Sequence, residues 1–174
     1  PLTLGIPIRP GCRMGPASAA TASLEVALAH ATRLLEAEPV LAEEQAREIL
    51  RAIGDHPRAL HVLAMARVGM GDDQAAVGVL GPLARDCPRW AQVHADLGAA
   101  LARLGRMGEA VAALRHATAT QPQLPDAWLA LADALRASGD AEGADAACLQ
   151  HVRQAAKDPR LLAIGKALFE NRLP

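Results

Sequence analysis

Apolar and polar residues alternate along this chain with the spacing of amphipathic helices, and the pattern recurs every 34 residues. Leu63, Leu97 and Leu131 fall in register, and each is followed by a small residue. Two sets of glycines and alanines further along the chain have the same spacing of 34 residues. The small residues after the leucines are Ala64, Gly98 and Ala132, and the two later sets are Gly71, Gly105 and Gly139, and Ala76, Ala110 and Ala144. A fixed period of this length predicts stacked helical units that bury their apolar faces only against their neighbours.

The best-defined unit shows how the pattern predicts a pair of helices. Leu97 and Leu101 are four residues apart and therefore lie on one helical face, while Gly98 lets a neighbouring helix approach closely. Gly105 is expected just past the end of this helix, because it tolerates a positive φ. A second helix follows over about 109–120, and the proline after it stops the helix. Each unit is therefore an αα-hairpin.

Over the whole chain, the pattern predicts an all-α, right-handed solenoid of about four helix-turn-helix hairpins and a half repeat. We expect a poorly ordered segment at 1–22 and the solenoid at 23–174, with hairpins at about 23–57, 58–88, 91–122 and 125–159 and the half repeat at 160–174. The half repeat has an apolar face that no second helix covers. This face is expected to meet a continuation of the parent protein, to close the array as a cap, or to self-associate. Its apolar residues are Leu161, Ile164, Leu168 and Phe169.

Composition narrows the partners that this solenoid can have. The formal net charge is −1, so the chain has no overall field that would hold a polyanion or an acidic membrane. We therefore expect neither nucleic acid nor a membrane as partner. The three cysteines form no C-x-x-C pair, which is typical of a reducing compartment, and Cys148 replaces a leucine of the repeat as a small buried side chain. With no apolar run of about 20 residues and no signal peptide, the sequence predicts a cytoplasmic protein.

The repeat resembles the tetratricopeptide repeat (TPR). The pattern that carries the resemblance is Trp128-x-x-Leu131-Ala132-x-x-Leu135, followed by Gly139, Ala144 and a helix-closing proline. The resemblance covers roughly 23–174 and implies the TPR fold and a role in binding proteins or peptides. The chain departs from the pattern at several positions. His94 and Leu60 replace the tryptophan, Arg67 replaces a bulky apolar residue, and His151 stands where other units have Leu83 and Ala117.

A narrower resemblance comes from the amino-acid sequences of several short segments. They are Ala46–Pro57, Pro88–Ala91, Leu124–Trp128 and Gly143–Ala146. These segments look like the N-terminal TPR region of bacterial TPR-containing sulfotransferases. In that family the array precedes an α/β domain that transfers sulfate from PAPS (3′-phosphoadenosine-5′-phosphosulfate). The resemblance implies that this chain is a recognition region, with any catalytic domain following Pro174.

Within the chain itself, the residues predict no catalysis and no cofactor or metal. A PAPS- or nucleotide-binding site needs a glycine-rich turn between a strand and a helix, and here the glycines fall at helix turns one repeat apart. The six histidines include no H-x-x-x-H pair. Asp72 and Asp73 mark the start of a helix, where an N-cap is expected. Glu43 and Glu44 are expected on a solvated helix face.

The expected functional surface is the concave groove, which the first helix of each hairpin lines in TPR arrays. The positions that remain after the packing stripe is assigned are Arg58, His61, Met65, Gln92, Asp96, Arg103, Asp126, Leu129, Asp133 and Arg136. This set lacks the Lys/Arg/Asn cluster of the carboxylate clamp, so it does not predict an acidic C-terminal peptide as ligand. We expect apolar burial by Met65 and Leu129, oriented by Arg103 and Arg136.

The sequence thus favours a module that binds a protein or peptide. The first hypothesis makes it the N-terminal recognition region of a larger, PAPS-dependent sulfotransferase. The alternative is a stand-alone TPR scaffold for the assembly of a bacterial complex, in the envelope or in secretion, with no enzyme attached.

Overall fold

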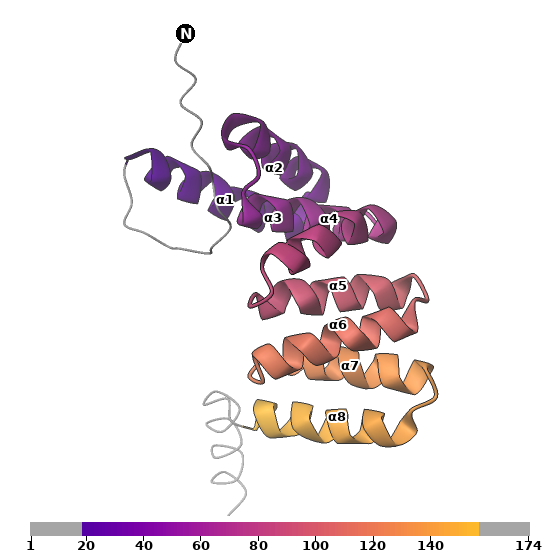
Figure 1. The fold of residues 1–174 in the computed structure, drawn as a ribbon. Helices are drawn as coiled ribbons and strands as arrows, with labels where there is room; N and C mark the ends of the chain where they lie inside the picture. The colour runs from indigo at the N-terminus through magenta and orange to yellow at the C-terminus, as the bar shows by residue number, and fades with distance from the viewer. Residues whose placement is uncertain (1–18, 157–174) are drawn as a thin grey trace, which may run out of the picture.

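The computed structural model describes residues 19–156, and these form eight helices. The helices are α1 (Ala19–Ala37), α2 (Pro39–Ile53), α3 (Pro57–Gly69), α4 (Asp73–Asp86), α5 (Ala91–Arg103), α6 (Met107–Thr120), α7 (Pro125–Ala137) and α8 (Ala141–Ala155). They pack as consecutive hairpins, which confirms the all-α repeat fold (Figure 1). Helix α1 begins at Ala19, before the expected boundary at 23. The half repeat at 160–174, with its self-association surface, and residues 1–18 lie outside the described part.

The helices fall into two rows. Each helix packs against the next one along the chain, and α1, α3, α5 and α7 also contact one another in series. Among the described residues, α2, α4, α6 and α8 form no comparable contacts with each other. We call the first set the inner row and the second set the outer row. Because the inner helices crowd together and the outer helices spread apart, the inner row forms the concave side of the array.

The turn inside each of the last three hairpins uses the expected glycine. Gly71, Gly105 and Gly139 have φ values of 80°, 76° and 88°, which L side chains rarely adopt. At the first of these turns, the Asp72 N–H donates to the Arg67 carbonyl at 2.9 Å. This hydrogen bond encloses the six residues from Arg67 to Asp72. This is the Schellman motif, which satisfies carbonyls left without partners at a helix end. The prediction for these glycines is confirmed.

Aspartates begin two of the outer helices. The Asp72 carboxylate accepts a hydrogen bond from the Ala75 N–H at 3.0 Å, and Asp140 accepts one from the Gly143 N–H at 2.8 Å. Each bond satisfies a backbone donor that has no partner within the first turn. The expected helix-capping role of Asp72 is therefore confirmed.

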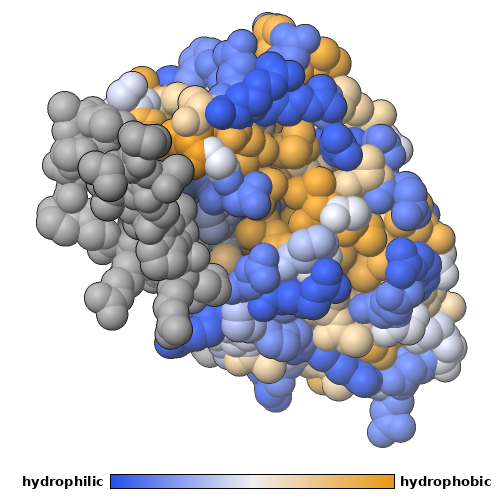
Figure 2. All heavy atoms as spheres, turned by 45° about the horizontal axis from the view of Figure 1, so that its top comes forward, coloured by the Kyte–Doolittle hydropathy of each residue, from blue (hydrophilic) through white to orange (hydrophobic). Residues whose placement is uncertain are grey.

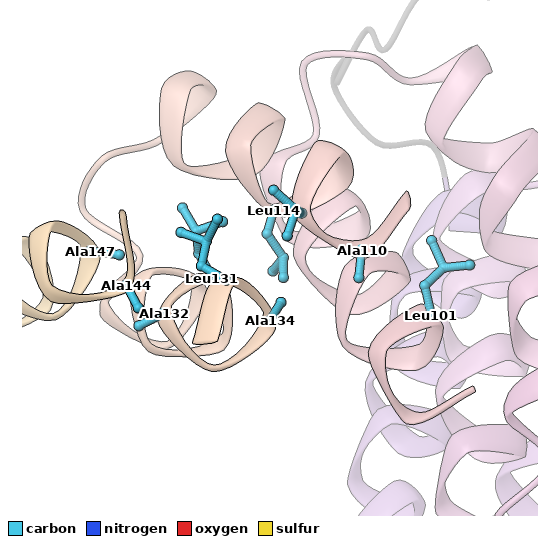
Figure 3. Packing of buried hydrophobic residues seen from close by; sticks show 10 residues of the cluster. Leu101, Ala110, Leu114, Leu131, Ala132, Ala134, Ala144 and Ala147 are labelled. Atoms are coloured by element: carbon cyan, nitrogen blue, oxygen red, sulfur yellow. The ribbon is translucent and has the colours of Figure 1, made fainter. Parts of the chain in front are cut away.

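The core is a series of small apolar clusters that run through the stack. Four clusters of buried residues follow one another, and partly buried side chains connect them. Leu97 packs against two of these clusters, and so do Val79 and Leu50. Figure 3 shows the last cluster, to which α5, α6, α7 and α8 contribute. Cys148 packs against this cluster partly buried, as expected for a small side chain in a leucine position.

One departure from the repeat creates a buried ionic contact between α2 and α3. Arg67 stands where Leu101 stands in the next unit, and its Nε donates to Glu43 Oε1 at 3.1 Å. Glu43 is only 9% exposed, and Arg47 also pairs with it at 2.8 Å. The expectation of a solvated face at Glu43 was wrong. A carboxylate this buried needs cationic partners, and Arg67 supplies one across the helix interface.

Some apolar surface remains outside the core. Leu129, Leu149 and Val152 are 44%, 59% and 61% exposed. Figure 2 shows one face of the molecule, on which apolar side chains gather in the middle and polar side chains border them. Surface of this kind, apolar inside and polar at the rim, is available for contact with a partner.

Helices α5 and α6 approach each other closely at Gly98 in α5. A Cβ built on this residue would stand 2.5 Å from Leu114 Cγ and 3.1 Å from the Ala110 carbonyl oxygen of α6. The first distance is shorter than any real Cβ contact and the second is tighter than most, so a side chain here would push α5 and α6 apart. The prediction that a small residue is needed for close approach is confirmed.

We expect Gly98→Ala to lower the free energy of unfolding by about 1–3 kcal/mol, because of overpacking. Gly78→Ala in α4 is the matched control, since a Cβ there meets nothing within 4 Å. This second variant should gain roughly 0.5–1 kcal/mol from helix propensity. Urea denaturation followed by circular dichroism measures both. Equal effects of the two substitutions would contradict the close approach at Gly98.

Candidate functional site

The ten residues expected in the groove all lie on inner-row helices. Helix α3 carries Arg58, His61 and Met65, helix α5 carries Gln92, Asp96 and Arg103, and helix α7 carries Asp126, Leu129, Asp133 and Arg136. The structure brings several of them into contact across helices. The three arginines are all engaged in ion pairs with acidic residues.

Arg58 connects the first two hairpins. Its Nη1 donates to Glu25 Oε2 of α1 at 2.5 Å, and both side chains are about half exposed. An exposed pair of this kind adds little to stability, on the order of 0–1 kcal/mol. It does neutralise Arg58, so this guanidinium is not an uncompensated charge on the inner row.

His61 is the centre of a polar cluster that joins α3 to α5. Its Nε2 lies 2.6 Å from Asp96 Oδ2, and the Gln92 amide donates to Asp96 Oδ1 at 3.0 Å. The His61 ring also lies against the Trp90 indole, with centroids 5.1 Å apart. The side chains of His61 and Asp96 are only 19% and 14% exposed. Both oxygens of this carboxylate therefore have protein partners, and the four residues form a preorganised platform.

Arg103 is held at the end of a neighbouring helix. Its guanidinium makes three hydrogen bonds of 2.6–2.9 Å to the Asp73 carboxylate, at the first residue of α4. Such a bidentate pair has a defined geometry. Asp73 is also placed where a carboxylate suits the helix dipole. Arg103 therefore joins the second hairpin to the third.

Arg136 and Asp133 pair within α7. The Arg136 Nη1 donates to Asp133 Oδ1 at 3.2 Å, and its Nη2 lies 3.7 Å from Cys148 Sγ of α8. This arrangement compensates Asp133 and directs part of the guanidinium toward the outer row. Of the charges expected in the groove, Asp126 is exposed and forms no ion pair within the described residues.

The apolar members of the expected site differ in accessibility. Leu129 is 44% exposed and lies one turn after Asp126 on α7. Met65 on α3 is half-buried. The inner row thus offers an accessible apolar side chain next to an uncompensated carboxylate at its α7 end.

Two inner-row contacts were missed by sequence reasoning. The tilted Trp90 ring lies against His61 from the residue that precedes α5, and Glu25 of α1 pairs with Arg58. Trp90 is one of only two tryptophans in the chain, and an aromatic at a helix start could have marked it. Glu25 lies in the hairpin where the 34-residue register is lost, so the repeat offered no guide to it.

A second histidine cluster lies between α5 and α6. The rings of His94 and His116 stack with centroids 3.9 Å apart, and His94 Nε2 is buried without a hydrogen-bond partner. Burial lowers the pKa of His94, and the neighbouring His116 lowers it further. His94 replaces the tryptophan of the repeat, so a smaller and more polar ring fills a position made for a bulky apolar one.

The described residues hold no grouping of three or more His, Cys, Asp or Glu side chains that could bind a metal ion. In that part of the chain, every helix is also too short or too polar to cross a bilayer. The inner row instead consists of compensated ion pairs, amide groups and apolar side chains. These groups suit the binding of a polypeptide segment.

Comparisons with known proteins agree with this architecture. The sequence matches the tetratricopeptide repeat family over residues 101–168. The consecutive hairpins of the fold agree with this match, which covers the last part of the described array. No curated protein matches the sequence significantly.

Solved structures with similar folds include several of MamA. One MamA crystal structure is 17% identical, with a TM-score of 0.69, and the match covers 82% of this chain and 84% of that chain. A structure of MamA AMB-1 is 24% identical, with a TM-score of 0.64, over 84% of this chain and 81% of that one. An O-GlcNAc transferase mutant from Thermobaculum terrenum is 24% identical, with a TM-score of 0.64, over 69% of this chain and 23% of that one. These likenesses concern the fold.

We expect stability to depend on pH through His94. Because its pKa is lowered on folding, the folded state binds fewer protons than the unfolded chain, so stability is complete above the unfolded pKa of 6.5 and falls as pH drops below it. His94→Phe keeps a ring against His116 but removes this titration. The unfolding free energy of the variant should fall less between about pH 7.5 and about pH 5 than that of the wild type. Urea denaturation at the two pH values measures this, and an unchanged pH dependence would rule out His94 as a source.

Proposed function

We propose that this chain is a protein-interaction module that binds a polypeptide segment along its inner row, and that it performs no catalysis. The observation that carries the proposal is the preorganised platform of His61, Trp90, Gln92 and Asp96, next to helix α7, which exposes Leu129. A TPR fold is a protein-binding fold in general. Groups already fixed by their mutual contacts lose little conformational entropy when a partner arrives.

The charges of the inner row point to a different mode of binding from the one that the sequence suggested. Arg58, Arg103 and Arg136 are each neutralised by a carboxylate of this chain. They therefore stabilise the arrangement of the helices more than they orient a ligand. On α7, Leu129 and Asp126 are exposed and are not engaged in an ion pair, whereas the exposed Asp133 and Arg136 pair with each other.

We infer an interaction scaffold as the first interpretation. Its support is the likeness in fold to MamA, since the match covers 84% of the first of those chains. The same fold occupies only 23% of the transferase chain, which supports an arm attached to an enzyme as the alternative. The hypothesis that this enzyme is a sulfotransferase rests on the amino-acid sequences of the short segments described above. None of the reported matches is a sulfotransferase.

We expect Leu129→Glu to weaken peptide binding by about tenfold or more, because it places a charge in the apolar contact. The measurement uses fluorescence anisotropy with peptides selected from a random 12-residue phage library on the wild-type protein. Leu149→Glu on α8 is the control, because Leu149 is also exposed but belongs to the outer row. This control should bind as the wild type does. Selected peptides that bind both variants equally well, or that are lost only with the control, would refute binding at the inner row.

A further inference from the structure

A cleft on the outer row separates α4 from α6. Its volume is about 680 Å³, and helix α5 forms its floor through His94, Leu97 and Leu101. The walls come from α4 and α6, which form no extensive contact with each other. The cleft is therefore on the opposite side of α5 from the platform of His61 and Asp96, and the proposed inner-row function does not use it.

The α4 wall is built from residues that weaken a helix. Gly78, Gly81 and Pro82 all lie within α4, and all three line the cleft. In a helix interior, each glycine costs about 1 kcal/mol relative to alanine, and proline costs about 3 kcal/mol. Proline also lacks an N–H, so Pro82 cannot donate to the Gly78 carbonyl one turn earlier.

The fold itself does not require these two glycines. A Cβ built on Gly78 or on Gly81 meets no atom within 4 Å, whereas one on Gly98 would collide with Leu114. Both residues also have ordinary negative φ values, since neither is among the glycines with positive φ. An open glycine on a cleft wall leaves the backbone accessible to something that approaches from outside.

Two further features make room in the same cleft. Ala112 and Ala113 form the middle of the α6 wall, between Glu109 and His116, so the walls are lowest where these alanines face the glycines of α4. On the floor, His94 stands where the next unit has the larger Trp128. Small residues on facing helices are what allows an additional helix to pack closely between them.

The charges that line the cleft do not balance. Arg106 and Glu109 neutralise each other through two hydrogen bonds of 2.8 Å. Arg85 also lines the cleft, and it has no ion-pair or hydrogen-bond partner within the described residues. The cleft therefore offers one uncompensated cation beside an apolar slot, and a carboxylate complements it.

We propose that the cleft between α4 and α6 binds a helical segment of a partner protein. The face of that helix carries small and apolar residues against Gly78, Gly81 and the alanines, and one carboxylate that pairs with Arg85. A slot bounded by two helices and floored by a third has the shape that another helix fills, and the low walls set a short distance between the axes.

The test is a selection of single helices on the wild-type protein. The probe is a phage library of 18-residue helical peptides whose contact face is randomised, counterselected against Gly78→Leu. A Cβ at this position meets nothing within 4 Å, and leucine has a higher helix propensity than glycine, so the variant should fold with its side chain in the slot. The matched control is Gly108→Leu in α6, where a Cβ also meets nothing within 4 Å but the residue does not line the cleft. Circular dichroism and thermal melting verify that both variants are folded.

We expect the selection to enrich Asp or Glu at one position of the contact face. A selected peptide should lose about tenfold or more in affinity for Gly78→Leu and none for Gly108→Leu. A version of this peptide in which the selected Glu is replaced by Lys should bind the wild-type protein about tenfold more weakly. Its affinity should recover with the protein variant Arg85→Glu. The inner-row variant Leu129→Glu should bind the selected helix normally, which separates this site from the proposed function.

Three results would overturn the proposal. The first is a selection that yields no helix dependent on Gly78, and the second is enrichment of Lys or Arg on the contact face. The third is a wild-type protein that sediments as an oligomer which Gly78→Leu dissociates. In that third case the occupant of the cleft is a second copy of this chain.

Discussion

The array depends on the close approach between the two helices of each hairpin. At Gly98, the α5 backbone comes so near to Leu114 and to the Ala110 carbonyl of α6 that no Cβ fits. Neighbouring hairpins use Ala64 and Ala132 at the same place, and both are fully buried. Because this contact sets the distance between paired helices, it also determines where the next hairpin docks. The two rows and the continuous core follow from repeating it.

Polar side-chain contacts lie on the surface of this packed array and connect one hairpin to the next. Arg103 joins α5 to Asp73 of α4, and His61 joins α3 to Asp96 of α5. Most of these pairs are partly exposed, so each adds little to stability. Their effect is on the surface. They neutralise cations that would otherwise dominate the concave side, and they hold the Asp96 carboxylate and its neighbours in one arrangement. The buried pair of Arg67 and Glu43 performs a similar function inside the interface of α2 and α3.

The sequence allowed the hairpins, their turns and their caps to be predicted, because these depend on local rules and on a fixed period. Gly105 is an example, since its role follows from its place after an amphipathic stretch. The partners of the charged residues could not be predicted in the same way. Arg103 and Asp73 are thirty residues apart. The repeat pattern predicts the helix face on which each residue lies, but it does not predict the rotamer of the side chain or its partner. The first hairpin was also harder to predict, because a single residue, Glu38, separates α1 from α2 and the period of 34 is lost.

Helix α5 has a special position between the two candidate surfaces. Asp96 belongs to the inner platform and His94 to the floor of the outer cleft, and residues two apart on a helix point to nearly opposite sides. Of the described helices, only α5 contributes to both. Its contact with α6 is constrained by Gly98 and cannot loosen without a loss of packing, whereas α4 carries glycines that no contact within the fold requires. Adjustment to a ligand is therefore easier on the α4 wall than on α5. The array combines a rigid helix shared by two surfaces with a weaker helix at the edge of one of them.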